Sequence, residues 1–443
     1  MSTAPSIFSE PFHLRGNFAP VFDELTVTDL PVTGAIPKEL NGRFFRNGSN
    51  PKSGTSPHWF MGNGMLHGVR LEGGRAVWYR NRYVRTPLLE DPNAAAINPD
   101  GSTDMKASLA NTHVVAHAGK ILALEEGHLP WVVSKDLDTV GAHDFGGKLK
   151  TAMTAHPRLC PVTGELLFFG YGALPPYLTY HRVAKDGTLV QSEEIAVKGP
   201  TMMHDWNVTR NYVVFMDLPM VFDLSLLAQG GIPIRWSDDY GARLGVMPRN
   251  GSNKDVVWYE IEPSYVFHPM NAYEDGDNIV LDVARFKKLA FSPQDGEGTP
   301  SVLHRWVIDR KAGKVREQPL DDCPADFPRV ADETVGLKNR YGYMTGLSTD
   351  MGEFGGQLLK YDLASGRSEA WRLPKGHGAG EPVFARAGHA EDEGYVLTFV
   401  YDAARGASDL VVIDAQNFDK GPIARVHLPR RVPYGFHGSW IAD

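Results

Sequence analysis

The sequence predicts an all-β fold of the β-propeller type, and three observations point to it. Short β-rich runs recur in pairs around tight turns. Helical periodicity is nearly absent along the chain. The 443 residues include 46 glycines and 31 prolines, a share above the ~12% of an average protein, which favours many turns over long helices. Evenly spaced hairpins without a strict sequence repeat are typical of a propeller, whose sheets leave only short, protected edges.

The predicted hairpins follow one another along the chain, each with a glycine at or beside its turn. They span residues 69–84 around Gly73-Gly74, 113–124 around Ala118-Gly119, 183–195 around Asp186-Gly187, 271–283 around Asp275-Gly276-Asp277, 307–315 around Gly313, and 358–371 around Ser365-Gly366. A pair of β-sandwiches is the competing topology. No Pro/Ser-rich linker divides the chain, however, so we expect a single domain over residues 1–443.

The most apolar stretch covers residues 212–228 and reads YVVFMDLPMVFDLSLLA. Asp217, Pro219 and Asp223 interrupt it, so it cannot cross a bilayer as a helix. We expect an internal strand followed by a short helix. The alternative is a segment that lies against a membrane surface or lines an apolar tunnel.

Charge and cysteine content exclude several classes of function. The formal net charge is −8 and no basic stripe is present, which argues against nucleic acid as a partner. Cys160 and Cys323 are the two cysteines, and neither belongs to a C-x-x-C pair, so a disulfide framework and a thiolate metal site are excluded. Reduced thiols and an N-terminal sequence without a signal-peptide pattern indicate a cytoplasmic protein.

Four of the sixteen histidines lie in apolar or aromatic surroundings, where burial of an unpaired imidazole would be costly. They are too far apart for a local metal motif. In a propeller, however, the inner strands of different blades converge on one axis, where distant histidines can meet. A metal site is one interpretation, and buried histidines that bond backbone carbonyls are the other. The four are His156 in TAMTAHPR, His204 in PTMMHDWNVT, His268 in SYVFHPMNAYEDGD and His437 in VPYGFHGSW.

These four segments, with LNGRFFRNGSNP (residues 40–51) and HWFMGNGMLHGV (residues 58–69), resemble the carotenoid cleavage oxygenase family, which includes carotenoid, apocarotenoid and stilbene dioxygenases and the retinoid isomerase. The resemblance runs from about Phe18 to the C-terminus. It implies a seven-bladed β-propeller with a cap of loops and short helices over an axial non-haem iron(II), Fe(2+). Neutral imidazoles suit this ion, and four of them leave two positions for dioxygen and substrate. The implied ligands are His156, His204, His268 and His437.

The resemblance also implies carboxylates that hydrogen-bond three of the ligand histidines and so fix their tautomers. Glu126 and Glu381 match two of these positions, whereas Asp326 stands where the family usually has Glu. Its shorter side chain must draw the backbone closer or bond through water, so we expect this contact to be the least secure. From the residue alone, Asp326 would cap a turn.

Other positions implied by the resemblance concern the substrate. Thr112 in LANTHVV matches a threonine whose methyl group blocks one open iron position, although by itself it is an ordinary strand residue. Phe60, Phe267 and Phe327 match aromatic positions along the substrate tunnel, where flat rings suit a conjugated chain. Without the resemblance they would be assigned to the core.

The substrate class is less clearly indicated. The residue before the first supporting glutamate is often Trp in carotenoid-cleaving members and Lys in stilbene-cleaving ones, and here it is Glu125. Residues 97–110 also lack the tyrosine of the stilbene group. An apocarotenoid-like polyene is therefore preferred over an aryl alkene of the stilbene, isoeugenol or vinylguaiacol type. Glu125 would accept a hydrogen bond from a substrate hydroxyl or point into solvent.

The reaction implied by the resemblance is iron(II)-dependent cleavage of one C=C bond of a carotenoid or apocarotenoid by O2, which gives two carbonyl products. The expected partners are a small apolar conjugated alkene and O2, with contact to a membrane surface for substrate uptake. A retinoid-type isomerase and a propeller scaffold with a degenerate centre are the alternatives from other classes.

Overall fold

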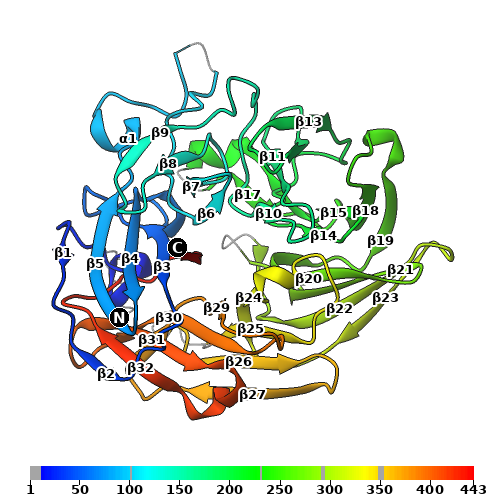
Figure 1. The fold of residues 1–443 in the computed structure, drawn as a ribbon. Helices are drawn as coiled ribbons and strands as arrows, with labels where there is room; N and C mark the ends of the chain where they lie inside the picture. The colour runs from blue at the N-terminus through cyan, green and yellow to red at the C-terminus, as the bar shows by residue number, and fades with distance from the viewer. Residues whose placement is uncertain (1–10, 100–101, 230–231, 291–294, 348–353) are drawn as a thin grey trace, which may run out of the picture.

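The computed structural model describes residues 11–99, 102–229, 232–290, 295–347 and 354–443. Within these ranges, seven sheets of four or more strands stand around a central axis, and Figure 1 looks along that axis. The predicted β-propeller is therefore confirmed, and it has seven blades. Among the described residues, no helix combines the length and the apolar character needed to cross a bilayer.

Five blades are four-stranded antiparallel sheets, formed in chain order from the axis outwards. They are β6 (His113–His117), β7 (Lys120–Leu124), β8 (Trp131–Val133) and β9 (Thr139–Ala142); β10 (Arg158–Leu159), β11 (Leu166–Tyr171), β12 (Leu178–Val183) and β13 (Leu189–Glu194); β14 (Asn207–Val208), β15 (Tyr212–Asp217), β18 (Ala242–Pro248) and β19 (Val257–Ile261); β20 (Tyr265–Asp275), β21 (Asn278–Phe286), β22 (Ser301–Asp309) and β23 (Lys314–Pro319); and β24 (Ala325–Arg329), β25 (Tyr341–Gly346), β26 (Gln357–Asp362) and β27 (Arg367–Arg372).

The other two blades combine strands from both ends of the chain. One holds β28 (His377–Ala379), β29 (Val383–Arg386), β30 (Gly394–Asp402), β31 (Ala407–Asp414), β32 (Pro422–His427) and β2 (Val32–Gly34). The last holds β33 (Gly438–Ala442), β3 (Gly42–Ser49), β4 (Gly64–Glu72), β5 (Arg75–Tyr83) and β1 (Thr26–Val27).

The C-terminal strand β33 closes the ring, because it is the innermost strand of a blade whose other strands come from the N-terminal part of the chain (Figure 1). It runs antiparallel to β3, with Gly42 opposite Ala442 and Arg46 opposite Gly438. A Cβ atom on Gly438 would lie 2.5 Å from the carbonyl oxygen of Phe45, so the close approach of the two strands requires glycine here.

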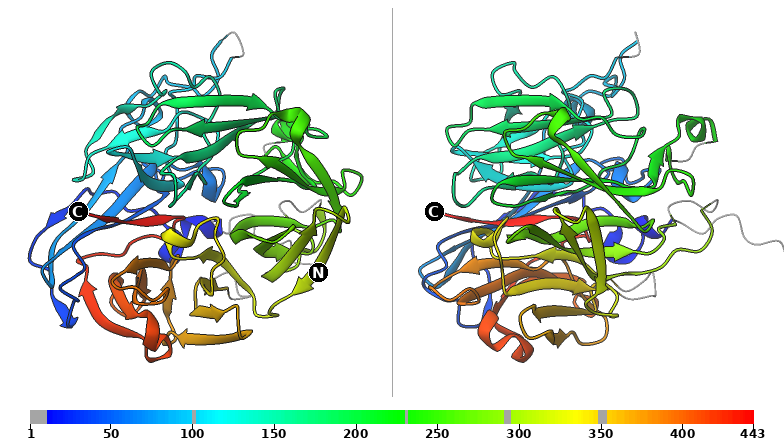
Figure 2. Two further views of the ribbon diagram at one scale, coloured as in Figure 1. Left: turned by 45° about the vertical axis from the view of Figure 1, so that its right-hand side comes forward. Right: turned by 90° about the vertical axis from the view of Figure 1, so that its right-hand side faces the viewer.

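The connections form short helices and one small ribbon. On one side of the ring lie η1, η2 and the ribbon with η4, and the end of β33 lies on the opposite side (Figure 2). These elements are η1 (Phe12–Leu14), η2 (Gly16–Phe18), η3 (Trp59–Met61), α1 (Pro87–Glu90), the ribbon of β16 (Met220–Phe222) and β17 (Ile234–Trp236), η4 (Leu224–Gln229), η5 (Asn253–Asp255), η7 (Asp332–Thr334) and η8 (Ala415–Lys420).

The apolar core lies between neighbouring blades. Phe169 of β11 and Phe215 of β15 meet the fully buried Trp206 between their sheets, with ring centroids 5.4 and 6.1 Å from the indole. Residues 212–228 form β15, β16 and part of η4, so the predicted internal strand and short helix are present, with a second short strand between them. The interrupting Asp217 is buried and bonds Arg243 at 2.7 Å, which satisfies its charge.

Candidate metal centre

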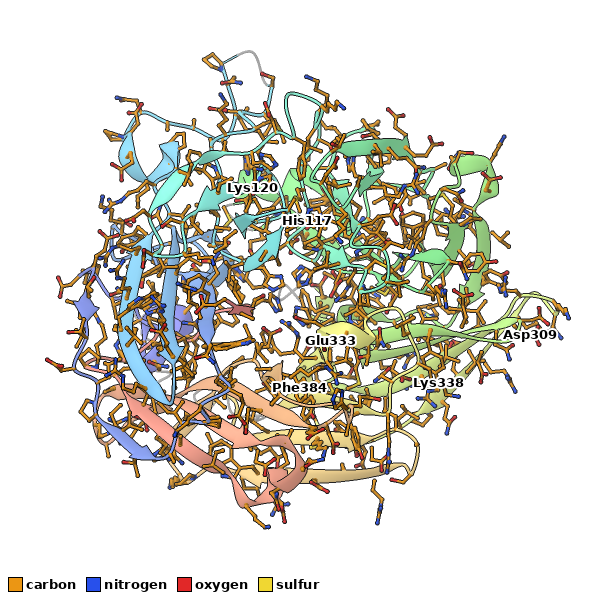
Figure 3. The ribbon with its side chains drawn as sticks, in the orientation of Figure 1. His117, Lys120, Asp309, Glu333, Lys338 and Phe384 are labelled. Carbon is orange, nitrogen blue, oxygen red and sulfur yellow. The ribbon has the colours of Figure 1, made fainter. Side chains whose placement is uncertain are left out.

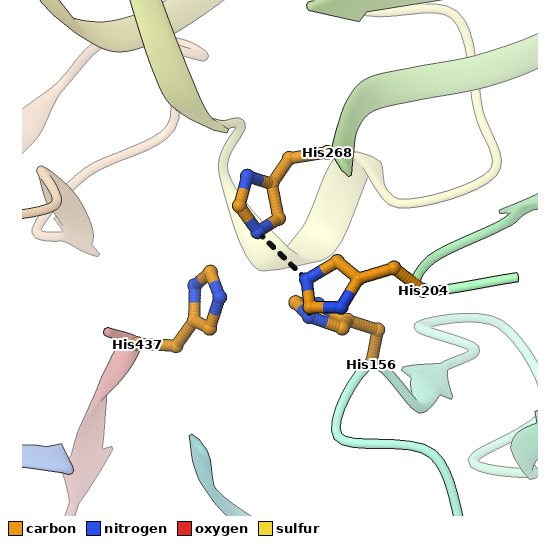
Figure 4. Close-up of side chains that lie close together, drawn as sticks. All are labelled: His156, His204, His268 and His437. Atoms are coloured by element: carbon orange, nitrogen blue, oxygen red, sulfur yellow. Dashed lines mark hydrogen bonds between the residues drawn. The ribbon is translucent and has the colours of Figure 1, made fainter. Parts of the chain in front are cut away.

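Four imidazoles from four different blades meet on the propeller axis (Figure 4). His268 belongs to β20, and the other three lie just before the inner strands β10, β14 and β33. All four are buried, and their potential ligand atoms lie within 4.8 Å of one another. The Nε2 atom of His204 is 3.0 Å from that of His156 and 3.2 Å from that of His268. The structure thus brings together the four histidines that the sequence singled out.

Irregular strand pairing orients the side chains of His268 and Asp326 towards the axis. The register of β20 on β21 shifts on either side of Pro269, next to His268, and the register of β24 on β25 shifts between Asp326 and Arg329. Such bulges turn a side chain away from the regular alternation of a strand. Phe327, inside the second bulge, has a left-handed φ of +53°, a strained conformation for an aromatic residue.

Carboxylates contact the Nδ1 atoms of three histidines, as expected from the resemblance. Asp326 Oδ1 lies 2.8 Å from Nδ1 of His268, and Glu381 Oε1 lies 2.9 Å from Nδ1 of His437. Glu126 Oε1 lies against Nδ1 of His204. Each ring therefore directs Nδ1 to a carboxylate and Nε2 to the axis, where its lone pair is free for a metal.

Asp326 makes its contact directly, so the expectation that this would be the least secure of the three is wrong. The bulge in β24 brings the backbone close enough for the shorter side chain. The same oxygen accepts a hydrogen bond of 2.7 Å from the backbone N–H of Phe327, which fixes the carboxylate further.

A fourth carboxylate, Asp205, completes the set and was missed by the sequence reasoning. Its Oδ2 lies 3.3 Å from Nδ1 of His156, and its Oδ1 accepts a 2.6 Å hydrogen bond from Arg158. Burial raises the pKa of Asp205, and Arg158 opposes that rise. The available signal was its position directly after His204 in MMHDW.

Two further groups hold the carboxylates. The phenol of Tyr171 donates a hydrogen bond to Glu126 Oε2. Arg329 Nη1 donates to the carbonyl of Gly438 at 2.9 Å and lies 3.3 Å from Glu381 Oε2. Neither residue was singled out from the sequence, because each touches a carboxylate on a different blade.

Burial favours the neutral form of two of the imidazoles, which is the form that binds a metal cation. Burial, followed by the neighbouring imidazoles, holds the pKa of His156 and of His437 well below its ordinary value. Burial also opposes charge on His268, but Asp326, with Asp205 and Glu381, raises the pKa of that ring. Buried imidazoles with lone pairs on a common axis fit iron(II) or another divalent transition metal.

Aromatic rings cover the imidazoles. The ring of Phe327 stacks on His268 at a centroid distance of 5.0 Å, and Phe267 meets His204 edge-on at 5.2 Å. Phe60 lies farther out and packs on Phe436 at 5.6 Å. Around them stand Trp59, Phe354 and Phe436, which the sequence reasoning did not select.

Thr112 lies beside the cluster, since its carbonyl accepts a 3.0 Å hydrogen bond from the backbone N–H of His437. Its hydroxyl donates to Asn111 Oδ1 at 2.9 Å. This arrangement orients the threonine side chain at the start of β6. Its expected role in blocking a metal position stays a prediction.

Glu125 is buried, so the alternative that it points into solvent is wrong. One of its oxygens accepts from the N–H of Leu109 at 2.9 Å, and the other meets Gly127 N–H at 2.8 Å and His128 Nδ1 at 2.5 Å. Burial opposes its charge, but His128 and the backbone N–H groups of Leu109 and Gly127 together lower the pKa of Glu125. The carboxylate thus fixes its own loop, and its contact with a substrate stays a prediction.

Comparison with known proteins identifies the family of the chain. The family model described as retinal pigment epithelial membrane protein (RPE65) matches residues 18–442. A carotenoid cleavage oxygenase of Mycobacterium tuberculosis is 38% identical, with 99% of both chains covered. The chain belongs to the carotenoid cleavage oxygenase family. Carotenoid 9,10(9',10')-cleavage dioxygenase 1 of Arabidopsis thaliana is 35% identical over 98% of this chain and 91% of its own.

Solved structures of carotenoid cleavage oxygenases and their relatives share the fold. Lignostilbene dioxygenase of Pseudomonas brassicacearum is 30% identical with a TM-score of 0.89, and all of both chains is covered. Cobalt-substituted ACO of Synechocystis is 26% identical with a TM-score of 0.85, covering 96% of this chain and 97% of its own.

In this member of the carotenoid cleavage oxygenase family, Asp326→Asn and Glu381→Gln are expected to weaken metal binding equally, by roughly 10- to 100-fold, because each carboxylate bonds its ligand histidine directly. Cobalt(II) titration of the apo-protein measures the affinities. Glu369→Gln, at an exposed position on the outer strand β27, is the control. If Asp326→Asn kept the wild-type affinity for cobalt while Glu381→Gln lost affinity, the two carboxylates would not have equal roles.

Proposed function

We propose that the chain is an iron(II)-dependent dioxygenase that cleaves a conjugated C=C bond of a carotenoid or apocarotenoid to two carbonyl products. The observation that carries the proposal is the buried four-histidine cluster, which faces an aromatic wall. His156, His204, His268 and His437 would hold the iron. When bound, iron supplies the redox chemistry with O2 that protein side chains lack.

The aromatic wall has two tasks in this proposal. Phe267 and Phe327 lie directly against ligand imidazoles, so an alkene stacked on them would lie beside the metal. The rings also exclude water from that face. The carboxylates keep each ligand proton on Nδ1, so that Nε2 stays available during turnover.

The named relatives support a polyene substrate, since those of M. tuberculosis and A. thaliana are called carotenoid-cleaving enzymes. The structural likeness to a lignostilbene dioxygenase keeps an aryl alkene as the second candidate. Glu125, which stands where stilbene-cleaving members carry Lys, uses both oxygens to fix its loop. This arrangement favours the polyene.

Iron-loaded protein mixed anaerobically with apocarotenals, hydroxystilbenes and propenyl phenols should form aldehydes only after air is admitted. A retinoid-type isomerase would give products without O2, and a scaffold would give none. Mass spectrometry of the products decides among them. We expect the highest kcat/KM for an apocarotenal. If a propenyl phenol or hydroxystilbene were cleaved tens of times faster than any apocarotenal, an aryl alkene would be the preferred substrate class instead.

Phe327→Trp is expected to lower kcat/KM for a long polyene by about tenfold or more, and to affect a compact propenyl phenol less, because the larger indole narrows the space beside His268. Thr112→Phe should act in the same direction. Relative kcat/KM values for two purified substrates measure the effect. An equal loss for both substrates would indicate damage to the metal centre rather than to the substrate site.

We also propose that residues 1–443 act as one domain, because strands from both ends of the chain share a blade. The expectation of a cytoplasmic protein stays a prediction. Contact with a membrane surface for substrate uptake is likewise a proposal. It is supported by the side chains of Leu224 and Leu227 on η4, which are 47% and 56% exposed.

A further inference from the structure

A cavity of about 510 Å³ runs along the propeller axis, with the four-histidine cluster at one end. His156, His268 and His437 line its inner end, and the exposed residues Leu159, Glu333 and Ala442 line its outer end. Glu333 lies near the centre of the ring in the view along the axis (Figure 3). This axial channel therefore connects the cluster with the surface on the face where β33 ends.

The lining of the axial channel mixes apolar and charged side chains, and its net charge is negative. Its lining includes two arginines, Arg158 and Arg329, and four carboxylates, those of Asp205, Asp332, Glu333 and Glu381, which gives a formal charge of −2 with neutral histidines. A negative lining attracts cations and raises their rate of arrival. The aromatic wall of Phe267 and Phe327 offers no such groups, and a hydrated cation would lose its water there at high cost.

His113, the first residue of β6, is a fifth histidine beside the cluster and lines the channel. Its ring centroid is 5.2 Å from that of His437. Its Nδ1 donates to the carbonyl of Ala155 at 2.8 Å, but its Nε2 is buried without a hydrogen-bond partner among the described residues. Because Nδ1 carries the proton that bonds the Ala155 carbonyl, Nε2 of a neutral ring carries a lone pair. A buried polar atom without a partner requires an explanation.

We propose that the axial channel is the route by which the metal ion reaches the cluster, and that His113 Nε2 is its first protein ligand before transfer to the four histidines. The proposal rests on the metal site proposed above and goes beyond it. The alkene and the metal ion thus reach the centre from opposite faces, one apolar and one charged.

Rates of cobalt(II) uptake by the apo-protein, followed by absorbance in a stopped-flow instrument, test this route. His113→Asn retains a donor for the Ala155 carbonyl and removes Nε2. We expect uptake to slow by about tenfold while the final content stays at one ion per chain. The matched control is His117→Gln on the same strand (Figure 3), where Nε2 is already bonded to the carbonyl of Gly164 at 3.0 Å.

A second variant narrows the channel without touching a histidine. Ala116 lines the channel and is exposed, so Ala116→Trp should slow both cobalt uptake and its removal by a chelator, since one route serves both directions. Ala404→Trp, at an exposed turn outside the channel lining, should keep wild-type rates.

The outcomes separate the route from the function. If both His113→Asn and Ala116→Trp took up cobalt at the wild-type rate, the proposal would be overturned, and His113 Nε2 would bond only water. A His113→Asn protein that binds no cobalt at equilibrium would make His113 part of the final site and overturn its role as a transient ligand. If the wild-type protein binds no cobalt, the metal site itself fails, and the proposed function fails with it.

Discussion

Replacement of any one of His156, His204, His268 or His437 by alanine is expected to remove the metal and abolish alkene cleavage while the propeller stays folded. Each histidine comes from a different blade, so its neighbours along the chain cannot take its place. The fold should survive, because the apolar clusters that pack neighbouring blades together, such as the one around Phe169, Trp206 and Phe215, do not include the four rings. The cost in stability is that of one hydrogen bond lost by a buried carboxylate that keeps a second partner, about 1–3 kcal/mol.

Metal analysis, turnover and thermal unfolding of the four variants provide the measurements. His181→Ala is the matched control, since this histidine is also buried but bonds the hydroxyls of Thr151 and Ser192 at 2.7 and 2.9 Å. It should keep a full metal complement. Two or more of the four variants with normal metal content and activity would show that the ligand assignment is wrong.

Truncation after His437, which deletes β33, is expected to destabilise the protein severely and to remove the metal as well. The deletion breaks the ladder between β33 and β3, at about 1 kcal/mol per backbone hydrogen bond. It also removes Gly438, whose N–H bonds Glu381 at 2.8 Å and whose carbonyl bonds Arg329. Glu381 would then hold His437 at a free chain end.

Thermal unfolding and cobalt titration measure both effects. Truncation after Ala442 is the control, because it keeps β33 and removes only Asp443 with its ion pair to Arg43. Because the Asp443 side chain is 37% exposed, solvent partly screens this ion pair, and its loss should cost much less stability than loss of the β33 ladder. If loss of β33 left the unfolding temperature unchanged, the strand would not be needed to close the ring.

The hairpins could be predicted from the sequence because each is local. Gly73, Gly119 and Gly187 have the positive φ values, +56°, +74° and +90°, that these turns require. The number of blades could not be counted in this way. One inner edge is split between β28 and β29, and two blades are completed by strands from the opposite end of the chain.

The four histidines were found because their surroundings match a known family, whereas the groups that support them depend on contacts between blades. Asp205 follows His204 in the sequence but contacts His156 on another blade. Glu125 and Glu126 are a second example, within one loop, of contacts that the sequence alone does not show. Neighbouring residues point in different directions, so Glu126 meets His204 and Glu125 turns towards His128.

The position of the last histidine has a consequence for biosynthesis. His437 and β33 follow every other part of the site along the chain, so the ribosome makes them last. Until they emerge, the nascent chain has an unpaired inner edge on β3 and three of the four imidazoles. The complete four-histidine cluster can therefore form only after residue 437 has emerged, and a chain that stalls before this residue cannot assemble it.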